Sequence, residues 1–220
     1  MLLAPPVATA LLNGLQALWV GGAARRSVRE LIDTRERLGS PLWHLVDDGR
    51  LAGGALAAPV DGEGMPTREV TLVAEGRLRQ PLVSWLEARP PDRVSSGCRR
   101  RPSWRELPRT APTHLYQRPD PRVRVSDLLA ELERGYYLVE PAGGIEVDLG
   151  ANTFLLPVDG FAIQRGRATE PVAGALLRGR ISGFLRGLRG VARDLTFFPF
   201  SGMVGSPSLL VSGVELVGPS

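Results

Sequence analysis

The side chains best suited to catalysis or metal binding are two histidines and one cysteine, His44, His114 and Cys98. A cysteine nucleophile needs a base within hydrogen-bond reach and an electropositive setting. Arg99–Arg101 follow Cys98 directly and would lower its pKa, but no pattern in the sequence brings a histidine to it. A three-ligand zinc site would need all three residues, and their spacing does not support one. We therefore expect no cysteine nucleophile, no metal site and no cofactor, and we interpret His44 as structural.

A basic cluster is the second feature that could bind a ligand. All 27 basic residues are arginines, which we attribute to the codon usage of a G+C-rich genome, and seven of them lie between positions 89 and 109. Trp104 within this cluster raises nucleic acid as an alternative ligand, because phosphates bind arginine and bases stack on indole. A single tryptophan and a formal net charge of +4 are thin support for it. We instead expect a solvated loop, or a contact of Arg100, Arg101 and Arg109 with a peptide or a partner subunit.

Gly143 and Gly144 form the third feature. Adjacent glycines can cradle a phosphate where they lie between a strand and the start of a helix. No such context surrounds this pair, so it is typical of a turn. The alternative interpretation is that the pair helps to receive an extended peptide, which would bind by main-chain pairing at a strand edge.

Composition limits the class of protein. With 220 residues, 43% of them hydrophobic, the chain can bury a sizeable core, and it has no run of 18 apolar residues that would cross a membrane. The apolar N-terminus has no basic residue before it and is interrupted by prolines, which argues against a signal peptide. One cysteine excludes an internal disulfide and suits a reducing compartment. We expect a cytoplasmic protein with no membrane partner.

The elements that must position these residues follow from hydrophobic periodicity and turn signals. The spacing of Val7, Leu11 and Leu18 predicts a helix over 6–20, begun by the prolines at 5 and 6 and ended by the glycines at 21 and 22. Further helices are expected at 25–38, at 127–134 with Ser126 as N-cap, and at 181–191. Strands are expected at 42–48, at 68–74 with a return from 77, at 136–140, in a hairpin over 161–174, and at 208–217.

These elements predict an α+β fold, mainly an antiparallel, barrel-like sheet with a few short helices. The two hairpins turn at Glu75-Gly76 and at Arg165-Gly166. Residues 90–121 are rich in proline and show little periodicity, so we expect a long excursion there. We treat 1–220 as one region with a sub-boundary near 90–121.

Five segments in this order resemble the TldD/PmbA family, whose bacterial and archaeal members are described as zinc-peptidase subunits and whose older name is modulator of DNA gyrase. The resemblance runs from Leu2 to Gly218. The segments are VDGEGMPTREVTLVAEGRL, SSGCRRRPSWRELPRTAPTHLYQRPD, ERGYYLVEPAGGIEVDLGANTF, DGFAIQRGRATEPVAGALL and GSPSLLVSGVELVG. The resemblance also implies a further domain upstream in a full-length member, since this chain starts where the second half of such a protein would.

In the catalytic, TldD-like branch the N-terminal helix carries an HExxxH motif that binds zinc and supplies a general base. The resemblance places Ala4, Pro5 and Thr9 at its three functional positions. Alanine and proline cannot bind a metal or move a proton, and threonine is a poor zinc ligand. That branch also supplies a cysteine ligand from a glycine-rich loop, and the shorter equivalent here, PFSGMVGSPSLLV, has none.

Ala-Pro at this point resembles the PmbA-like branch, also called TldE, whose members lack the metal site and pair with a TldD-like subunit. The resemblance therefore implies a non-catalytic subunit or truncated paralogue that helps to bind extended peptides beside a TldD-like catalytic subunit. GCRRRPSWRELPRTAPTHLY is nearer to the TldD-like version of its loop. The alternative is a stand-alone, homo-oligomeric binding or scaffold module with no proteolytic role.

Overall fold

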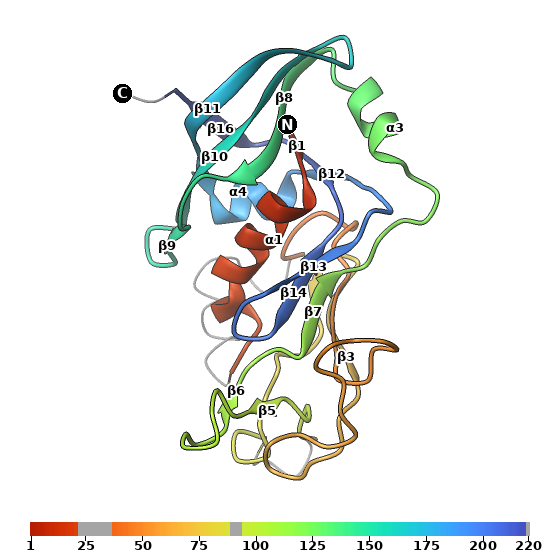
Figure 1. Ribbon diagram of the computed structural model, residues 1–220, viewed down its shortest axis with the longest axis vertical. Helices are drawn as coiled ribbons and strands as arrows, with labels where there is room; N and C mark the ends of the chain where they lie inside the picture. Colours follow the sequence, from red (N-terminus) through yellow and green to blue (C-terminus); the bar gives the residue numbers. More distant parts are fainter. Residues whose placement is uncertain (22–36, 89–93, 219–220) are drawn as a thin grey trace.

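A computed structural model describes residues 1–21, 37–88 and 94–218. Two sheets and a central helix make up most of it (Figure 1). The larger sheet has eight strands: in spatial order β12 (Leu188–Val191), β15 (Leu209–Val211), β1 (Leu2–Leu3), β8 (Arg134–Pro141), β10 (Thr153–Gln164), β11 (Arg167–Arg180) and β16 (Val214–Val217), with β9 (Glu146–Asp148) pairing β10 beside β8. All its pairings are antiparallel except β1 with β8.

The second sheet has six strands and lies below the first in Figure 1. In spatial order they are β13 (Thr196–Pro199), β14 (Met203–Ser206), β7 (His114–Gln117), β2 (Leu45–Asp48), β3 (Glu69–Ala74) and β4 (Arg77–Leu78). A separate two-stranded ribbon pairs β5 (Arg99–Arg100) with β6 (Arg109–Thr110). The predicted α+β class with mainly antiparallel strands is confirmed.

The larger sheet curls because two strands that adjoin in sequence lie far apart in its strand order. β15 is second and β16 is last, yet only Ser212 and Gly213 separate them. Gly213 has a φ of 73°, which favours glycine. A Cβ added to Gly187 would lie 1.9 Å from the carbonyl oxygen of Ser212, so the chain can pass this point only where residue 187 has no side chain.

The helix α1 (Pro5–Gly14) fills the space between the two sheets, packing against β8, β13 and β14 (Figure 1). Pro5 takes the first helical position, where a missing N–H costs no hydrogen bond. The helix is buried on all sides over residues 7–12, with Val7, Leu11 and Leu12 at 0% exposure. A short 3-10 turn, η1 (Gln16–Leu18), follows. None of the helices in the described residues is long and apolar enough to cross a bilayer.

Both predicted hairpins are confirmed. In each turn the two central residues have positive φ: 52° at Glu75 and 69° at Gly76, 49° at Arg165 and 71° at Gly166. Two consecutive positive φ values define the type I′ turn, whose twist matches that of the flanking strands. The shared x-Gly-Arg sequence therefore marks a shared turn geometry.

Several predicted boundaries are wrong. The N-terminal helix ends at Gly14 rather than 20, and α3 (Val125–Ala130) is capped by Arg124, with Ser126 inside its first turn. The predicted helix over 181–191 stops at Arg186 as α4 (Ile181–Arg186), and its second half is β12. The single strand predicted over 208–217 is two strands, and the excursion over 90–121 contains β5, β6 and the buried β7. The charged helix predicted at 25–38 lies almost wholly outside the described residues.

Candidate functional site

The first turns of α1 carry the residues that the resemblance drawn from the sequence assigns to a metal-binding motif. Ala4 is 3% exposed, and its backbone N–H donates a 2.8 Å hydrogen bond to the carbonyl of Leu138 on β8. Pro5 begins the helix without an N–H. Thr9 is fully buried, and its hydroxyl oxygen has no hydrogen-bond partner. A methyl group, a proline ring and one hydroxyl do not fit a zinc ion, which takes imidazole, thiolate or carboxylate ligands.

The rest of the described chain offers no other ligand set. Within residues 1–21, 37–88 and 94–218, no group of three or more His, Cys, Asp and Glu side chains is placed to hold a metal ion. His44 and His114 lie beyond opposite ends of the β2–β7 pairing, since Leu45 pairs with Gln117 and Asp47 with Leu115. The two histidines are therefore offset by four residues along the strands, which is about 13 Å at about 3.3 Å per residue.

Cys98 is buried at 1% exposure, and the expected lowering of its pKa is wrong. Burial raises the pKa of the thiol, and the nearby carboxylates of Asp47, Asp61 and Glu87 raise it further, while Arg99 lowers it less. A thiol in this setting stays protonated and is a poor nucleophile. The sequence suggested the opposite because the three arginines adjoin Cys98 along the chain.

His114 has a structural role, because both of its ring nitrogens contact backbone groups. Its Nδ1 lies 2.8 Å from the carbonyl oxygen of Asp48, and its Nε2 accepts a 3.2 Å hydrogen bond from the N–H of Leu56. Through these two contacts the ring ties the loop after β2 to the sheet. The ring also makes an edge-to-face contact with Phe197, at a centroid distance of 5.9 Å.

The structure brings Arg100, Arg101 and Arg109 together. All three line one pocket of about 370 Å³, whose opposite wall is the β13–β14 loop from Pro199 to Met203. Arg100 and Arg109 lie directly opposite each other on β5 and β6. Sequence reasoning did not predict that the β13–β14 loop joins this pocket, because the loop lies 90 residues beyond Arg109 along the chain.

Gly143 and Gly144 lie elsewhere, in the bend between β8 and β9. Neither has a positive φ. A Cβ on Gly143 would lie 3.1 Å from Cγ of Pro157, whereas Gly144 faces open space. The predicted turn is a bend instead, because β8 and β9 pair with successive parts of β10 and run in the same direction. The bend leads into a strand that borders a larger groove.

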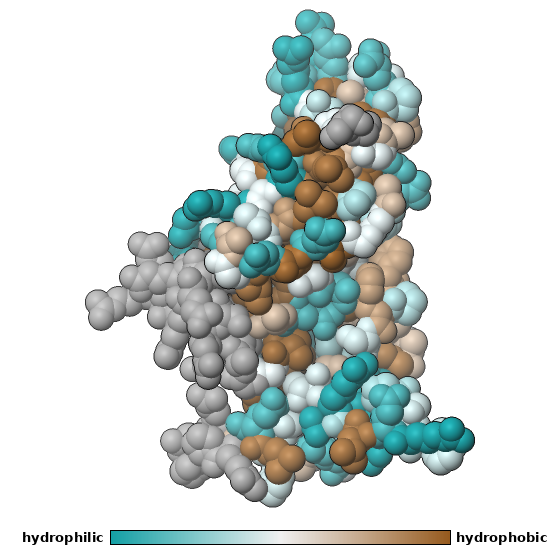
Figure 2. All heavy atoms as spheres, turned by 90° about the vertical axis from the view of Figure 1, so that its left-hand side faces the viewer, coloured by the Kyte–Doolittle hydropathy of each residue, from teal (hydrophilic) through white to brown (hydrophobic). Residues whose placement is uncertain are grey.

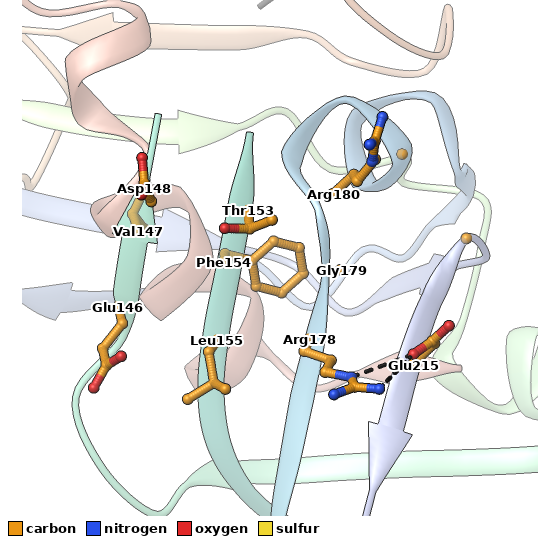
Figure 3. Close-up of a pocket in the computed structure, with 12 residues that line it drawn as sticks. Glu146, Val147, Asp148, Thr153, Phe154, Leu155, Arg178, Gly179, Arg180 and Glu215 are labelled. Carbon is orange, nitrogen blue, oxygen red and sulfur yellow. Dashed lines mark hydrogen bonds and ion pairs between the residues drawn. The ribbon is translucent and has the colours of Figure 1, made fainter. Parts of the chain in front are cut away.

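That groove, of about 810 Å³, crosses β9, β10, β11 and β16 at one level of the larger sheet (Figure 3). Glu146, Leu155, Arg178 and Glu215 form one cross-strand row along it. The guanidinium of Arg178 pairs with the carboxylate of Glu215 at 3.2 Å.

The next two rows alternate in character, as successive residues of a strand face opposite sides of a sheet. Val147, Phe154 and Gly179 form the middle row, in which Phe154 is buried. Asp148, Thr153 and Arg180 form the third row, with all three side chains exposed. Figure 2 shows the side of the molecule that carries β9 and β11, where hydrophobic side chains gather between hydrophilic ones.

The outer edge of β9 pairs with no strand among the described residues. An unpaired edge presents free N–H and C=O groups to which an extended chain can add. The groove therefore combines an open strand edge, apolar surface and charges of both signs. Sequence reasoning missed it because its residues come from four strands that are joined only in the folded sheet.

Comparison with known proteins places these features in a family. The model described as PmbA/TldA metallopeptidase C-terminal domain matches residues 1–218. A metalloprotease TldD homolog from Haemophilus influenzae is 30% identical over 145 residues, which cover 66% of this chain and 30% of that protein. A zinc metalloprotease TldD homolog from Saccharolobus solfataricus is 23% identical over 134 residues. The chain thus spans about a third of the length of these curated relatives.

Solved structures share the fold. The TldE protein of Thermococcus kodakarensis superposes with a TM-score of 0.84 at 20% identity, over 99% of this chain and 49% of that one. A proposed modulator of DNA gyrase from Thermotoga maritima gives 0.76 at 22% identity, over 98% of this chain and 49% of that one. The match of the family model to nearly every residue shows that the chain belongs to the PmbA/TldD family and corresponds to its C-terminal domain.

Proposed function

We propose that this chain is a metal-less, PmbA/TldE-like component of a TldD-type peptidase, which helps to bind extended peptides while another chain supplies the zinc. The observation that carries the proposal is the chemistry of α1. The resemblance assigns Ala4, Pro5 and Thr9 to the positions of the zinc-binding motif. None of them supplies a metal ligand of the usual kind or a general base. A cytoplasmic location is part of the same proposal.

The groove along β9, β10, β11 and β16 is the surface best suited to the peptide. Main-chain pairing at the open edge of β9 recognises an extended backbone without regard to sequence. The exposed charges of Asp148, Arg178 and Arg180 can then contact polar side chains of the peptide. Gly143 and Gly144 contribute by keeping the approach to β9 free of side chains.

Binding and cleavage are tested together with a fluorescein-labelled, unstructured ten-residue peptide. Fluorescence anisotropy measures its binding to the purified chain, and mass spectrometry after incubation with zinc salt measures its cleavage. We expect saturable binding and an intact peptide. Cleavage by the chain alone contradicts the proposal, and so does the absence of any binding.

A pair of matched variants locates the peptide. Thr153→Trp fills the groove from an exposed position on β10, whereas Thr169→Trp makes the same change at an exposed position on β11 outside it. Thr153→Trp should weaken binding about tenfold or more, a loss of roughly 1.4 kcal/mol, and Thr169→Trp should not. Equal affinities for the two variants would place the peptide elsewhere.

A further inference from the structure

The 370 Å³ pocket beside the β5–β6 ribbon brings several arginine side chains close together, where their positive charges repel one another. Arg100 and Arg109 are direct cross-strand partners in the β5–β6 register. Side chains so paired leave the same face of the ribbon with their Cβ atoms about 5 Å apart, and like charges in this relation repel. Arg101 lines the same pocket, so three guanidinium groups border about 370 Å³.

No carboxylate among the described residues forms an ion pair with them. The four ion pairs within residues 1–21, 37–88 and 94–218 involve Arg99, Arg118, Arg124 and Arg178, and none of the three pocket arginines. Arg101 donates a 3.0 Å hydrogen bond to the backbone carbonyl of Glu106, which carries no charge.

The acid that acts on Arg100 is Asp47, and it is buried at 2% exposure. Burial raises the pKa of Asp47 to about 7, against the lowering effects of backbone hydrogen bonds and of Arg100 itself. Near neutral pH its charge is therefore only partly present. The pocket keeps a net positive charge that a bound anion would offset.

The remaining wall is mainly apolar. Leu56, Pro102, Phe200 and Met203 contribute to it, and Phe200 is 45% exposed. The loop turns back on itself through a 2.7 Å hydrogen bond from the N–H of Phe200 to the carbonyl of Gly202. A Cβ on Gly202 would lie 2.1 Å from the carbonyl oxygen of Pro112. The β13–β14 loop therefore lies directly against the segment that precedes β7.

We infer that this pocket binds a carboxylate group on an apolar body, as carried by a peptide, with the arginines holding the carboxylate and the β13–β14 loop covering the adjoining side chain. Guanidinium groups match a planar carboxylate with paired N–H donors. Partial enclosure and the apolar wall favour such a ligand over a nucleic-acid backbone, which needs an open basic track. The carboxylate comes from the C-terminus of the peptide or from an acidic side chain. This inference rests on the proposed function, since the ligand is a peptide.

Three labelled peptides of one apolar sequence separate these sources in a binding titration with the 220-residue chain. The first has a free C-terminal carboxylate, the second a C-terminal amide, and the third the amide together with an internal glutamate. We expect the first to bind about tenfold more tightly than the second, the effect of one charge-assisted contact. Tight binding of the third would identify acidic side chains as a source.

Arg109→Gln removes one guanidinium from the pocket at an exposed position, and Arg105→Gln makes the same change outside it, where Arg105 lies over the Trp104 ring. The preference for a free carboxylate should disappear in Arg109→Gln and persist in Arg105→Gln. If peptides bind but all three forms bind equally well, the carboxylate pocket is wrong and the proposed function stands. If no peptide binds, both are wrong. Displacement of the peptide by inorganic phosphate at lower concentration than by acetyl-phenylalanine would also overturn the assignment to carboxylate.

Discussion

The indole nitrogen of Trp43 donates a 2.7 Å hydrogen bond to the backbone carbonyl of Leu185, 142 positions further along the chain. Trp43 lies just before β2 of the six-stranded sheet, and Leu185 lies in α4, directly after β11 of the larger sheet. The Trp43 ring also packs edge-on against Phe184 at 5.6 Å. This contact therefore fixes the two sheets relative to each other around α1.

Trp43→Phe should destabilise the protein by about 1 to 3 kcal/mol, because it removes a buried hydrogen bond and leaves space where the larger ring was. Urea denaturation followed by circular dichroism measures the loss. Trp104→Phe is the matched control, since Trp104 is 80% exposed. Equal stability of the two variants would show that the Trp43 contact contributes nothing to holding the sheets together.

The ionisation of Asp47 should make stability depend on pH. Its ordinary pKa of 3.8 applies to the unfolded chain, and burial raises the folded value to about 7. Between these values the folded state binds the proton more tightly, so the free energy of unfolding falls as pH rises from about 4 to about 7 and changes no further above that.

Asp47→Asn isolates this contribution from those of other groups. An asparagine does not ionise, and its oxygen can still accept the 2.7 Å hydrogen bond from the N–H of Thr113. Relative to the wild type, the variant should gain stability by a few kcal/mol between pH 4 and pH 8 in parallel urea titrations. A difference between the two proteins that stays constant over this range would show that Asp47 does not titrate there.

Cys98 should resist alkylation in the folded protein, because its thiol is buried and its pKa is raised. Iodoacetamide at pH 8 should modify it orders of magnitude more slowly in buffer than in denaturing urea, as measured by intact mass. Rapid modification of the folded chain would instead support the reactive thiol that the neighbouring arginines suggested from the sequence.

Gly187→Ala should disturb the closure of the larger sheet. The added methyl group would lie 1.9 Å from the carbonyl oxygen of Ser212, whose N–H also bonds to the carbonyl of Gly187 at 2.8 Å. We expect a loss of about 1 to 3 kcal/mol or more in urea denaturation. Gly144→Ala adds the same group in open space and should cost far less, and a similar cost for both variants would contradict the close approach.

Local signals in the sequence predicted the hairpins and the start of α1. The turns at 75–76 and 165–166 are decided by residues within the turn itself, and Pro5 sets the first helical position. Local propensity failed where distant contacts decide the structure. Residues 188–191 continue the apolar pattern of α4, yet they form β12 because β15, 20 residues later, pairs with them.

The candidate sites show the same limit. The three arginines could be identified as a group from the sequence. The pairing of Arg100 with Arg109 depends on the β5–β6 ribbon, which could not be predicted because the segment is rich in proline and shows little periodicity. The effect of burial on Cys98 and Asp47 depends on how the sheets pack around them. The arginines that adjoin Cys98 in the sequence therefore predicted a lowered pKa for its thiol, whereas burial raises it.

The zinc content of the purified chain is the most direct measurement of whether α1 lacks a metal site. The chain is dialysed against zinc salt, then against metal-free buffer, and analysed by inductively coupled plasma mass spectrometry. We predict no zinc above the buffer blank, and the same result for Thr9→Val, which replaces the buried hydroxyl with a methyl group. One zinc ion retained per chain, and lost in Thr9→Val, would contradict the assignment of this chain as a metal-less component.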